Sequence, residues 1–599
     1  MKKRLSCLLL SVLMVVLCFA GCAEKTGEEV MIEIGEKASK DAVTLSMYLM
    51  SEEKVSEEQE LAMEKAVNAI TEKEFKIRLD LRYFTPDEYY TRLDADLAEM
   101  TEYYDGEGIG RKEETPVYID ENGLPVTFYP SIQDFEVDIF YFGGYDRYLK
   151  YKEAGYIRDI STEVNGVAKA LKAVINTNLL EQVKVLNGKY DVIPVNRAIG
   201  EYTYMLLNKD VLRATQYSAN EITSLVDENC QDLLKLTKEM LGDEYVPLKS
   251  FTGELDLVDV EFFGADENGF KTNSFSAVAG TYNSSWEYGA AGSFPQMTDI
   301  FNTANNGKLS VEEQIKVLKQ YEFDGYYSDS DEKPFAVGYI KGGPEIVEEY
   351  SDDYEVVPVA LPQLETEDIY EHLFAIAEDT NSVLKSSEIL TYLNTNEEFR
   401  NLLLYGIEEE NYVWVDAVDE DGNFIVDENG ERYRVISMLD DKPELNYVMD
   451  PYKTGNVVIA YPAVGDNPES AELIREQNHN MKINYTFGLN FYNASFGDKT
   501  PLDLTALKKV TAESEKIYAD IVAAQNADEL TLAMEKLRAL VDGDDVKAVL
   551  KTPEPVAEAP EGEEGGEATE PETPAKVYSV ATYYDEWLIA KGLKVVAAE

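Results

Sequence analysis

The stretch GKYDVIPVNRAIGEYTYMLLNK, residues 188–209, decides how the rest of the chain is interpreted. Two apolar runs with strand character, residues 190–194 and 202–207, lie on either side of a polar elbow. The elbow carries side chains with strong hydrogen-bonding groups, namely Asn196, Arg197 and Glu201. We therefore predict two strands joined by a polar connection.

The backbone of this stretch is shaped by a proline and a glycine. Pro194 ends the pairing of the first run because it has no N–H group to donate. Gly200 permits a tight turn because it has no side chain to clash. The elbow then presents polar groups at the mouth of a sheet, where α/β proteins place ligand sites. The alternative is an ordinary hairpin within a mixed sheet.

The segments before the elbow alternate between strand and helix patterns. Residues 43–50 and 75–81 have strand character, and a Ser-x-x-Gln pattern at Ser56 opens a helix between them. Residues 137–142, VDIFYF, form a nearly continuous apolar run of the kind buried in a parallel sheet. This order predicts an α/β fold.

The elbow stretch resembles a segment of the family 1 extracellular solute-binding proteins of ABC importers. In that family a Y-x-x-I-P-x-N strand is followed by E-Y-x-Y-x-L-L-N-K, and the elbow faces the cleft between two lobes. Residues 393–412 also fit a family helix, L-x-T-x-x-E-x-x-N-L-L-x-Y-G-x-E-x-x-x-Y. Asn411 stands where the family usually has a histidine, which puts any ligand contact of that histidine in doubt. Near the C-terminus, Y-x-x-W-L-x-x-x-G at Trp587 resembles the family's last helix.

The resemblance implies an α/β clamshell of two lobes, like the type II periplasmic binding proteins, with a hinge and C-terminal helices. We expect a leader, a polar tether, a first lobe that the chain leaves and rejoins, and a second lobe completed by helices near the C-terminus. The Pro/Glu/Gly-rich segment before the last helix is predicted to be a disordered acidic insertion. The expected boundaries are 1–21 (signal peptide), 22–41 (tether), 42–155 (lobe I), 156–368 (lobe II), 369–480 (lobe I), 481–552 (lobe II), 553–576 (insertion) and 577–599 (last helix).

The N-terminus has the pattern of an export signal. A basic start, MKKR, precedes an apolar run over residues 5–19 that is too short for a comfortable membrane span. The sequence Phe-Ala-Gly-Cys then ends at Cys22 and resembles a bacterial lipobox, with Phe19 in place of the usual leucine. The resemblance implies cleavage before Cys22 and lipidation of its thiol. A plain secretory leader is the alternative.

Composition excludes some classes of protein. The 599 residues are 44% hydrophobic and carry a formal net charge of −61. A surface this acidic repels nucleic acid phosphates and anionic lipid headgroups, so we expect no nucleic acid partner. After the predicted cleavage, Cys22 and Cys230 are the remaining cysteines, and with Cys22 lipidated no intramolecular disulfide is expected.

The motifs of common catalytic sites are missing from the sequence. His372 and His479 are the only histidines, and neither belongs to an HExxH motif; there is no GxSxG either. We therefore expect no catalytic residues, no metal site and no cofactor. Paired carboxylates for glycoside hydrolysis stay open as an alternative, because acidic residues occur throughout the chain.

A sugar site needs aromatic faces for C–H groups and polar side chains for hydroxyl groups. The candidates lie at predicted strand ends, in the elbow and in one polar–aromatic cluster. They are Tyr48, Glu52, Tyr145, Asp146, Asn196, Arg197, Glu201, Trp286 and Glu287. For each, the competing interpretation is a core position or a loop hydrogen bond within its own lobe.

The sequence thus predicts the substrate-binding component of an ABC importer, lipid-anchored to the outer face of the cytoplasmic membrane. Its expected partners are a small solute, by preference a sugar or oligosaccharide, and ABC permease subunits; we expect a monomer. The rival classes are a lipid-anchored glycan hydrolase and a surface module for sensing or adhesion.

Overall fold

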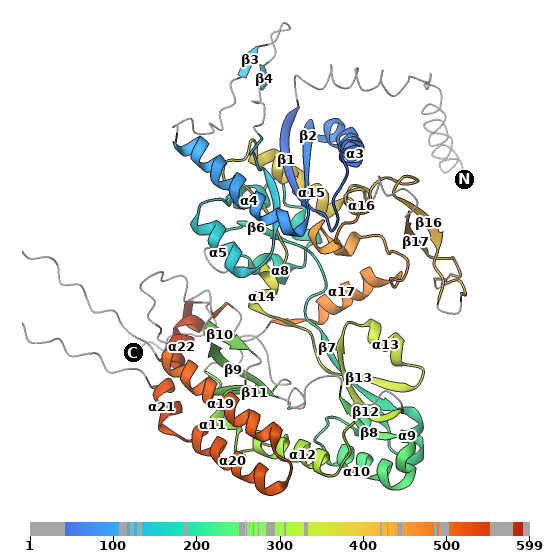
Figure 1. The fold of residues 1–599 in the computed structure, drawn as a ribbon, viewed down its shortest axis with the longest axis vertical. Helices are drawn as coiled ribbons and strands as arrows, with labels where there is room; N and C mark the ends of the chain where they lie inside the picture. Colours follow the sequence, from blue (N-terminus) through green and yellow to red (C-terminus); the bar gives the residue numbers. More distant parts are fainter. Residues whose placement is uncertain are drawn as a thin grey trace, which may run out of the picture.

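The computed structural model forms two α/β lobes that meet at a waist (Figure 1). Each lobe has its own hydrophobic core. The residues that the structure describes are 42–106, 117–119, 125–127, 134–184, 188–250, 258, 260–266, 269–272, 275–282, 294–304, 307–328, 333–419, 422–427, 429–439, 447–483, 488–489, 502, 504–551 and 579–590.

Lobe I, the upper half of Figure 1, is built on a five-stranded sheet. The strand order is β2 (Ile77–Phe84), β1 (Val43–Met50), β5 (Ile139–Phe142), β15 (Leu373–Ile376) and β6 (Val192–Pro194). β1 is parallel to β2 and β5, whereas β15 is antiparallel to β5 and β6. The carboxyl ends of β1 and β5 therefore lie at the same edge of the sheet.

Helices cover this sheet and complete the first core. The serine predicted to start the first helix does so, because the Ser56 hydroxyl accepts a hydrogen bond of 3.1 Å from the Gln59 N–H. The helices of lobe I are α3 (Glu57–Phe75), α4 (Pro86–Thr101), α5 (Tyr145–Glu153), α6 (Ser161–Asn165), α7 (Leu171–Val174), α8 (Thr177–Gln182), α14 (Thr366–Tyr370), α15 (Val383–Thr395), α16 (Glu397–Tyr405) and α17 (Ser470–Asn480).

Two short hairpins, one π-helical turn and two 3₁₀ turns complete the description of lobe I. β3 (Val117–Ile119) pairs with β4 (Pro125–Thr127), and β16 (Tyr412–Asp416) pairs with β17 (Arg434–Met438). The turns are η1 (Glu102–Gly106), η8 (Pro451–Lys453) and η9 (Val457–Ile459).

Lobe II contains two sheets. The larger has the order β13 (Tyr354–Ala360), β7 (Tyr202–Asn208), β12 (Phe335–Gly342) and β8 (Val246–Ser250); the smaller has the order β10 (Gly269–Thr272), β9 (Val260–Asp266) and β11 (Ala279–Tyr282). Its first helical elements are α9 (Lys209–Thr215), η2 (Ala219–Glu221), α10 (Glu228–Leu236), η3 (Thr237–Leu241), η4 (Gly242–Glu244), α11 (Met297–Ile300), α12 (Val311–Phe323) and α13 (Glu345–Tyr350).

The C-terminal helices complete lobe II, as the sequence predicted. They are α19 (Thr505–Ala523), α20 (Ala527–Val541), α21 (Asp544–Leu550) and α22 (Val580–Ala590). The Trp587 side chain on α22 is fully buried in the second core. The predicted insertion, 553–576, lies outside the described residues.

One predicted boundary is wrong. Lobe II was expected to begin at residue 156, but the apolar side chains between Ile157 and Ile199 belong to the core of lobe I. β6 pairs with β15 in the lobe I sheet, and the chain enters lobe II only at β7. The stretch 188–209 is therefore a crossing between lobes, and the alternative of an ordinary hairpin is also wrong.

Within the described residues, the chain crosses between the lobes three times. The first crossing joins β6 to β7, and the second joins β13 to β15 through β14 (Gln363–Leu364). The third follows α17 through β18 (Lys482–Ile483), which pairs in parallel with β14. We call these three segments the hinge. Because two of them form a small sheet, the hinge is an ordered element.

Amide side chains of α17 hold the first crossing. Asn478 accepts a hydrogen bond of 3.1 Å from the Ile199 N–H and donates one of 2.7 Å to the Arg197 carbonyl. Gln477 donates to the carbonyls of Ile199 and Gly200. Side chains of α17 thus supply hydrogen-bond partners for backbone groups of the elbow that solvent would otherwise have to satisfy.

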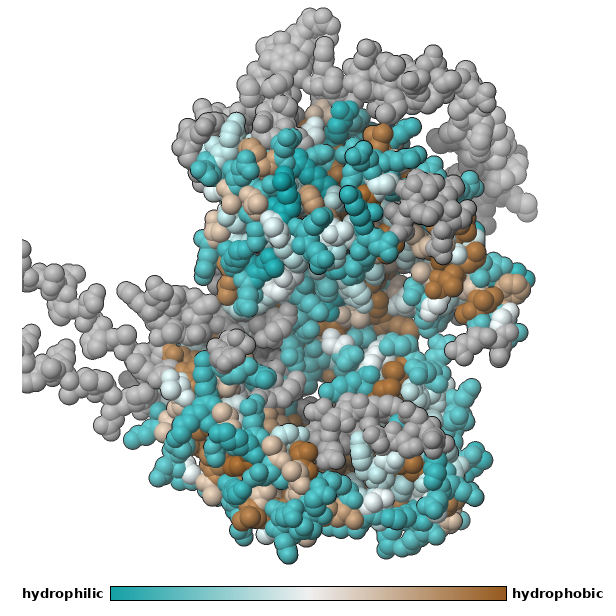
Figure 2. Space-filling model, in the orientation of Figure 1, coloured by the Kyte–Doolittle hydropathy of each residue, from teal (hydrophilic) through white to brown (hydrophobic). Residues whose placement is uncertain are grey.

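The outer surface is mainly hydrophilic, in agreement with the high content of charged residues. Figure 2 shows hydrophilic residues over most of the coloured part of both lobes. Among the described helices, none is long and apolar enough to span a membrane.

Candidate functional site

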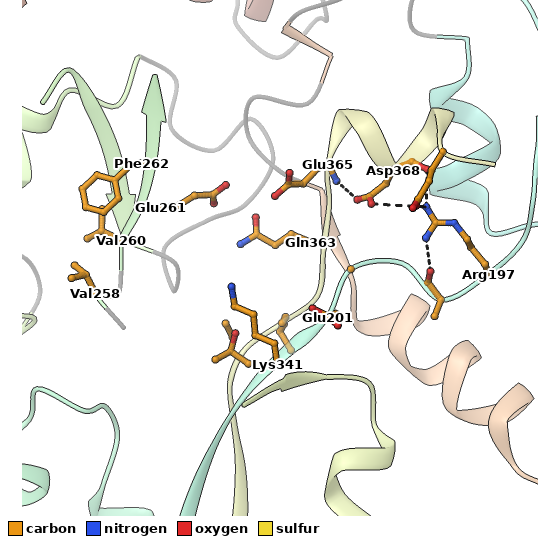
Figure 3. Close-up of a pocket in the computed structure, with 16 residues that line it drawn as sticks. Arg197, Glu201, Val258, Val260, Glu261, Phe262, Lys341, Gln363, Glu365 and Asp368 are labelled. Carbon is orange, nitrogen blue, oxygen red and sulfur yellow. Dashed lines mark hydrogen bonds and ion pairs between the residues drawn. The ribbon is translucent and has the colours of Figure 1, made fainter. Parts of the chain in front are cut away.

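A cavity of about 690 Å³ lies where the lobes meet, and both lobes and the hinge line it (Figure 3). Its volume is in the range of small-molecule sites. The lining residues are Arg197, Ala198, Gly200, Glu201, Thr203, Val258, Val260, Glu261, Phe262, Lys341, Ala360, Leu361, Gln363, Glu365, Asp368 and Glu371. A second cavity, of about 560 Å³, is lined by lobe II residues alone, between Lys209 and Asn220 and at Glu355.

The two sides of the cleft cavity differ in chemistry. The hinge and α14 supply mainly polar groups, with Arg197 and Asp368 close together on one side of Figure 3. Apolar side chains lie on the other side, namely Val260 and Phe262 of β9 and Val258, two residues before that strand. An apolar wall facing hydrogen-bonding groups suits a ligand with both C–H and hydroxyl surface.

The Arg197 side chain is fixed at the cavity by three hydrogen-bond acceptors. Its guanidinium donates to the Glu371 carboxylate, to the Ala198 carbonyl at 2.8 Å and to the Asp368 carbonyl at 3.0 Å. The residue is 7% exposed. Arg197 therefore links the first and second crossings on the lobe I side.

Asp368 lies beside this arginine. Burial raises the pKa of its carboxyl group, and the Glu365 N–H and the Arg197 charge partly offset that increase. The Glu365 N–H donates to the Asp368 carboxylate at 2.8 Å at the start of α14. This capping arrangement fixes where the second crossing turns into lobe I.

A group of stacked rings adjoins the cavity on lobe I. His372 follows the cavity residue Glu371; its ring centroid is 5.3 Å from that of Tyr452 and 6.1 Å from that of Tyr141, with interplanar angles near 30°. We call these three rings the aromatic shelf. Tyr452 is 37% exposed, whereas Tyr141 is buried. Tyr452 is therefore partly open to solvent, and it stacks on His372, whose Nε2 atom lies 3.8 Å from the carboxylate of the cavity residue Glu371.

Charged side chains border the aromatic shelf. Lys453 forms ion pairs of 2.7 Å with Glu52 and 3.2 Å with Asp450. Burial lowers the pKa of Lys453, but these two carboxylates outweigh it and the net shift is upward. Burial, together with the positive charge of Arg197, lowers the pKa of His372.

The elbow contributes two of the predicted site residues to the cavity. Arg197 and Glu201 both line it, although they lie in the hinge and not in lobe II as predicted. A third, Glu52, lies beside the aromatic shelf through its ion pair with Lys453. Glu52, although far from Arg197 and Glu201 in sequence, is thus brought to the same part of the molecule.

Other predicted site residues lie elsewhere. Tyr48 is fully buried in lobe I and donates to Asp96, because β1 is a central strand. Asn196 is 4% exposed, and its amide group bonds to the backbone of residues 174 and 176 and to Asn456. Both predictions of ligand contact are corrected to structural roles.

Tyr145 and Asp146 begin α5 and are not among the residues that line the cavity. The Tyr145 ring lies 5.3 Å from that of Tyr370 in lobe I. Asn411 is buried, and its side-chain oxygen accepts hydrogen bonds from Gln59 and from the Ile407 N–H. Asn411 therefore has a structural role within lobe I. Cys22, Trp286 and Glu287 lie outside the described residues.

Several cavity residues are not predicted from the sequence. They come from the second crossing, residues 361–371, from β9 and from Lys341. One signal is present: the acidic run ETEDIYEH directly precedes the apolar strand LFAI and so marks the start of a strand. For His372 the sequence argues only against a catalytic or metal-binding motif, and nothing in it marks the ring as a platform.

Within the described residues, no group of three or more His, Cys, Asp or Glu side chains is arranged to hold a metal ion. Cys230 is a free, buried thiol in lobe II, and burial raises its pKa. It is not among the cavity residues.

Comparison with known proteins gave structural likenesses only. No model of a known protein family matches the chain, and no curated protein matches it. The N-glycan transport solute-binding protein NgtS of Streptococcus pneumoniae is 16% identical, with a TM-score of 0.48 over 92% of this chain and 100% of that one.

Two further solved structures are similar. A solute-binding protein of Bifidobacterium longum infantis, described as binding human milk oligosaccharides (HMO) and associated with an ABC transporter, is 12% identical, with a TM-score of 0.44 over 85% of this chain and 97% of that one. A Staphylococcus aureus extracellular solute-binding protein in complex with maltose is 10% identical, with a TM-score of 0.34 over 85% of this chain and 100% of that one. Identities and TM-scores this low carry no conclusion about ligand or partner. The predicted α/β clamshell itself is confirmed by the two lobes, their separate cores and the hinge between them.

Proposed function

We propose that this chain is the substrate-binding component of an ABC importer and captures a carbohydrate between its lobes without altering it. The observation that carries the proposal is the cavity of about 690 Å³ whose wall comes from both lobes at a three-segment hinge. Rotation of the lobes about such a hinge would enclose a ligand and give a permease a closed form to recognise. The family motifs in the sequence point to the same role.

The chemistry of the cleft favours a sugar. A pyranose ring has C–H faces that pack on apolar and aromatic surface, and a rim of hydroxyl groups that donate to carboxylates and amides. Val258, Val260 and Phe262 provide the first kind of surface, and Gln363 and the acidic residues of the hinge provide the second. The exposed ring of Tyr452 extends the apolar surface beyond the cavity.

A ligand screen tests the proposal. The purified mature protein is heated with maltose, N-glycan fragments and human milk oligosaccharides, and hits are measured by calorimetry. A ligand at a hundredfold excess over its Kd adds about 2.7 kcal/mol to the free energy of unfolding. Mass spectrometry of the recovered glycans shows whether they stay intact. Cleaved products would favour the glycan hydrolase, and the failure of every sugar to bind would refute carbohydrate capture.

The aromatic shelf gives a sharper test with the best ligand from that screen. Tyr452→Ala removes the exposed ring and is expected to raise Kd by about twofold to tenfold, since one aromatic contact contributes about 0.5–1.5 kcal/mol. Tyr452→Phe keeps the ring and should bind nearly as the parent does. Leu532→Ala, at an exposed position on α20, is the remote control. Equal Kd values for all three variants would remove the aromatic shelf from the site.

We further propose that Cys22 anchors the protein through lipid to the outer face of the cytoplasmic membrane. A diacylglyceryl group supplies the two chains needed for stable anchoring. In a bacterial host, Cys22→Ala should release the protein into the medium, whereas Cys230→Ala should leave it in the membrane fraction. Retention of the Cys22→Ala protein in the membrane would refute lipid anchoring.

A further inference from the structure

We propose that the cleft selects against acidic glycans, so that a ligand bearing a carboxylate, sulfate or phosphate binds less tightly than its uncharged counterpart. This inference rests on the proposed function and adds the charge class of the ligand. It comes from the distribution of charged side chains around the cavity.

Among the described residues that line the cavity, more side chains are negative than positive. The carboxylates that line it are Glu201, Glu261, Glu365, Asp368 and Glu371, and the cations are Arg197 and Lys341. Five carboxylates against two cations leave a formal excess of three negative charges. Burial raises the pKa of Asp368, yet an excess of two remains even with that carboxyl group protonated.

One of the two cations is already engaged. The Arg197 guanidinium donates to the Glu371 carboxylate and to the carbonyls of Ala198 and Asp368, and the residue is 7% exposed. The Asp368 carboxylate also lies near this guanidinium, at 3.9 Å from it. An anionic ligand would have to compete with both carboxylates for this guanidinium. Its ion pair with Arg197 would replace one that already exists, so little binding free energy would be gained.

Lys341 is the other cation among the described lining residues. It lies near the end of β12 and is exposed, and Figure 3 draws no hydrogen bond or ion pair from it to the other residues shown. Glu261 on β9 and Glu365 on the second crossing line the same cavity, and so does Glu201. A single ammonium group among three carboxylates cannot make the potential of the cavity positive.

Uncharged sugars suit this arrangement better than acidic ones. A hydroxyl group donates a hydrogen bond to a carboxylate, so a neutral glycan can use every acid of the cavity as an acceptor. A ligand carboxylate has no proton to donate, and it adds repulsion from the cavity and from a chain whose net charge is −61.

The test compares glycans that differ in charge and little else. Isothermal titration calorimetry at 50 mM salt measures Kd for a neutral milk oligosaccharide, its sialylated form and the methyl ester of that sialylated form. The ester has the size of the acid without its charge. We expect the acid to bind at least about tenfold more weakly than the ester, and the difference to shrink at 500 mM salt because added ions screen the charges.

Charge-removing variants locate the effect. In Glu201→Gln/Glu365→Gln the ratio of Kd values, acid over ester, is expected to fall severalfold, because two of the repelling charges are gone while each glutamine keeps one acceptor oxygen. Glu535→Gln removes one exposed charge from α20 and should leave the ratio as in the parent.

The outcomes separate this inference from the proposed function. Equal Kd values for acid and ester, or tighter binding of the acid, would overturn the charge selection while leaving carbohydrate capture intact. A ratio that the double variant does not change would place the selection outside these carboxylates and would also overturn it. Binding of no glycan at all would refute the proposed function itself.

Discussion

Gly200 shows how a single residue shapes the hinge. Its φ is +62°, and a Cβ atom there would lie 2.5 Å from the Gln363 carbonyl oxygen and 2.7 Å from the Gln363 nitrogen. We expect Gly200→Ala to lower the free energy of unfolding by about 2–4 kcal/mol, because left-handed strain and a backbone clash act together. The measurement is urea unfolding followed by fluorescence.

Gly465→Ala is the matched control for that variant. Gly465 has a φ of +96°, but a Cβ atom added there would have no neighbour within 4 Å, so this substitution adds strain without a clash. We expect it to cost about 1 kcal/mol. If both variants lost the same stability, the close approach of the first and second crossings at Gly200 would not be supported.

His372 makes a prediction about pH. Burial and the charge of Arg197 lower its pKa from the ordinary value of about 6.5, against the opposing charges of Glu371 and Asp450, and Lys453 lowers it further. The folded protein therefore binds fewer protons here than the unfolded chain does. The contribution of His372 to stability is retained above about pH 6.5 and is lost as the pH falls from there through the lower folded pKa.

The measurement is the unfolding free energy of the parent and of His372→Gln between pH 5 and pH 8. The parent is expected to lose more stability than the variant as the pH falls, because carboxylates elsewhere titrate in both proteins and cancel in the difference. A difference that is constant across this range would contradict the lowered pKa.

At the level of single residues, the sequence predicts strand ends better than contacts. Arg197 and Glu201 could be found because a proline and a glycine mark their elbow. Tyr48 could not be placed correctly, because its sequence neighbours do not reveal that β1 is flanked by strands on both sides. Lys341 carries no local signal at all, since its role depends on β12 reaching the hinge.

At the level of elements, α22 shows how a distant segment completes a core. Tyr583 and Trp587 are both fully buried, and the Tyr583 ring lies 6.1 Å from that of Phe270 on β10. We expect Trp587→Ala to lower the free energy of unfolding by about 3–5 kcal/mol, as for other large core side chains. Denaturant unfolding measures the effect, and Leu532→Ala on the exposed face of α20 should change stability by less than about 0.5 kcal/mol. A loss below about 1 kcal/mol for Trp587→Ala would mean that α22 is dispensable.

The error in the lobe boundary also belongs to this level. The apolar run 190–194 predicts the strand that the structure shows as β6, but its pattern could not assign that strand to a lobe. β15 lies between β5 and β6 in the sheet although it follows both by more than 170 residues. Pairing over such sequence distances depends on the whole fold and leaves no local pattern.

At the level of the whole molecule, the separate cores and the ordered hinge imply motion of rigid lobes. The apolar side chains of lobes I and II fall into different clusters, so rotation about the hinge need not disturb either core. The second and third crossings are joined by backbone pairing between β14 and β18. This pairing favours rotation of one lobe against the other over sliding of the lobes past each other. The acidic cleft should resist closure until a ligand supplies hydrogen-bond donors to its carboxylates.

Small-angle scattering with and without the best ligand from the screen measures that closure. We expect the radius of gyration to fall when the ligand is saturating, because ligand bound between the lobes stabilises the closed form. Leu532→Ala should repeat the change, whereas Tyr452→Ala should require a higher ligand concentration to reach it. A radius of gyration that stays constant at saturation would mean that the lobes do not close on the ligand, and capture would then have to occur within a fixed cleft.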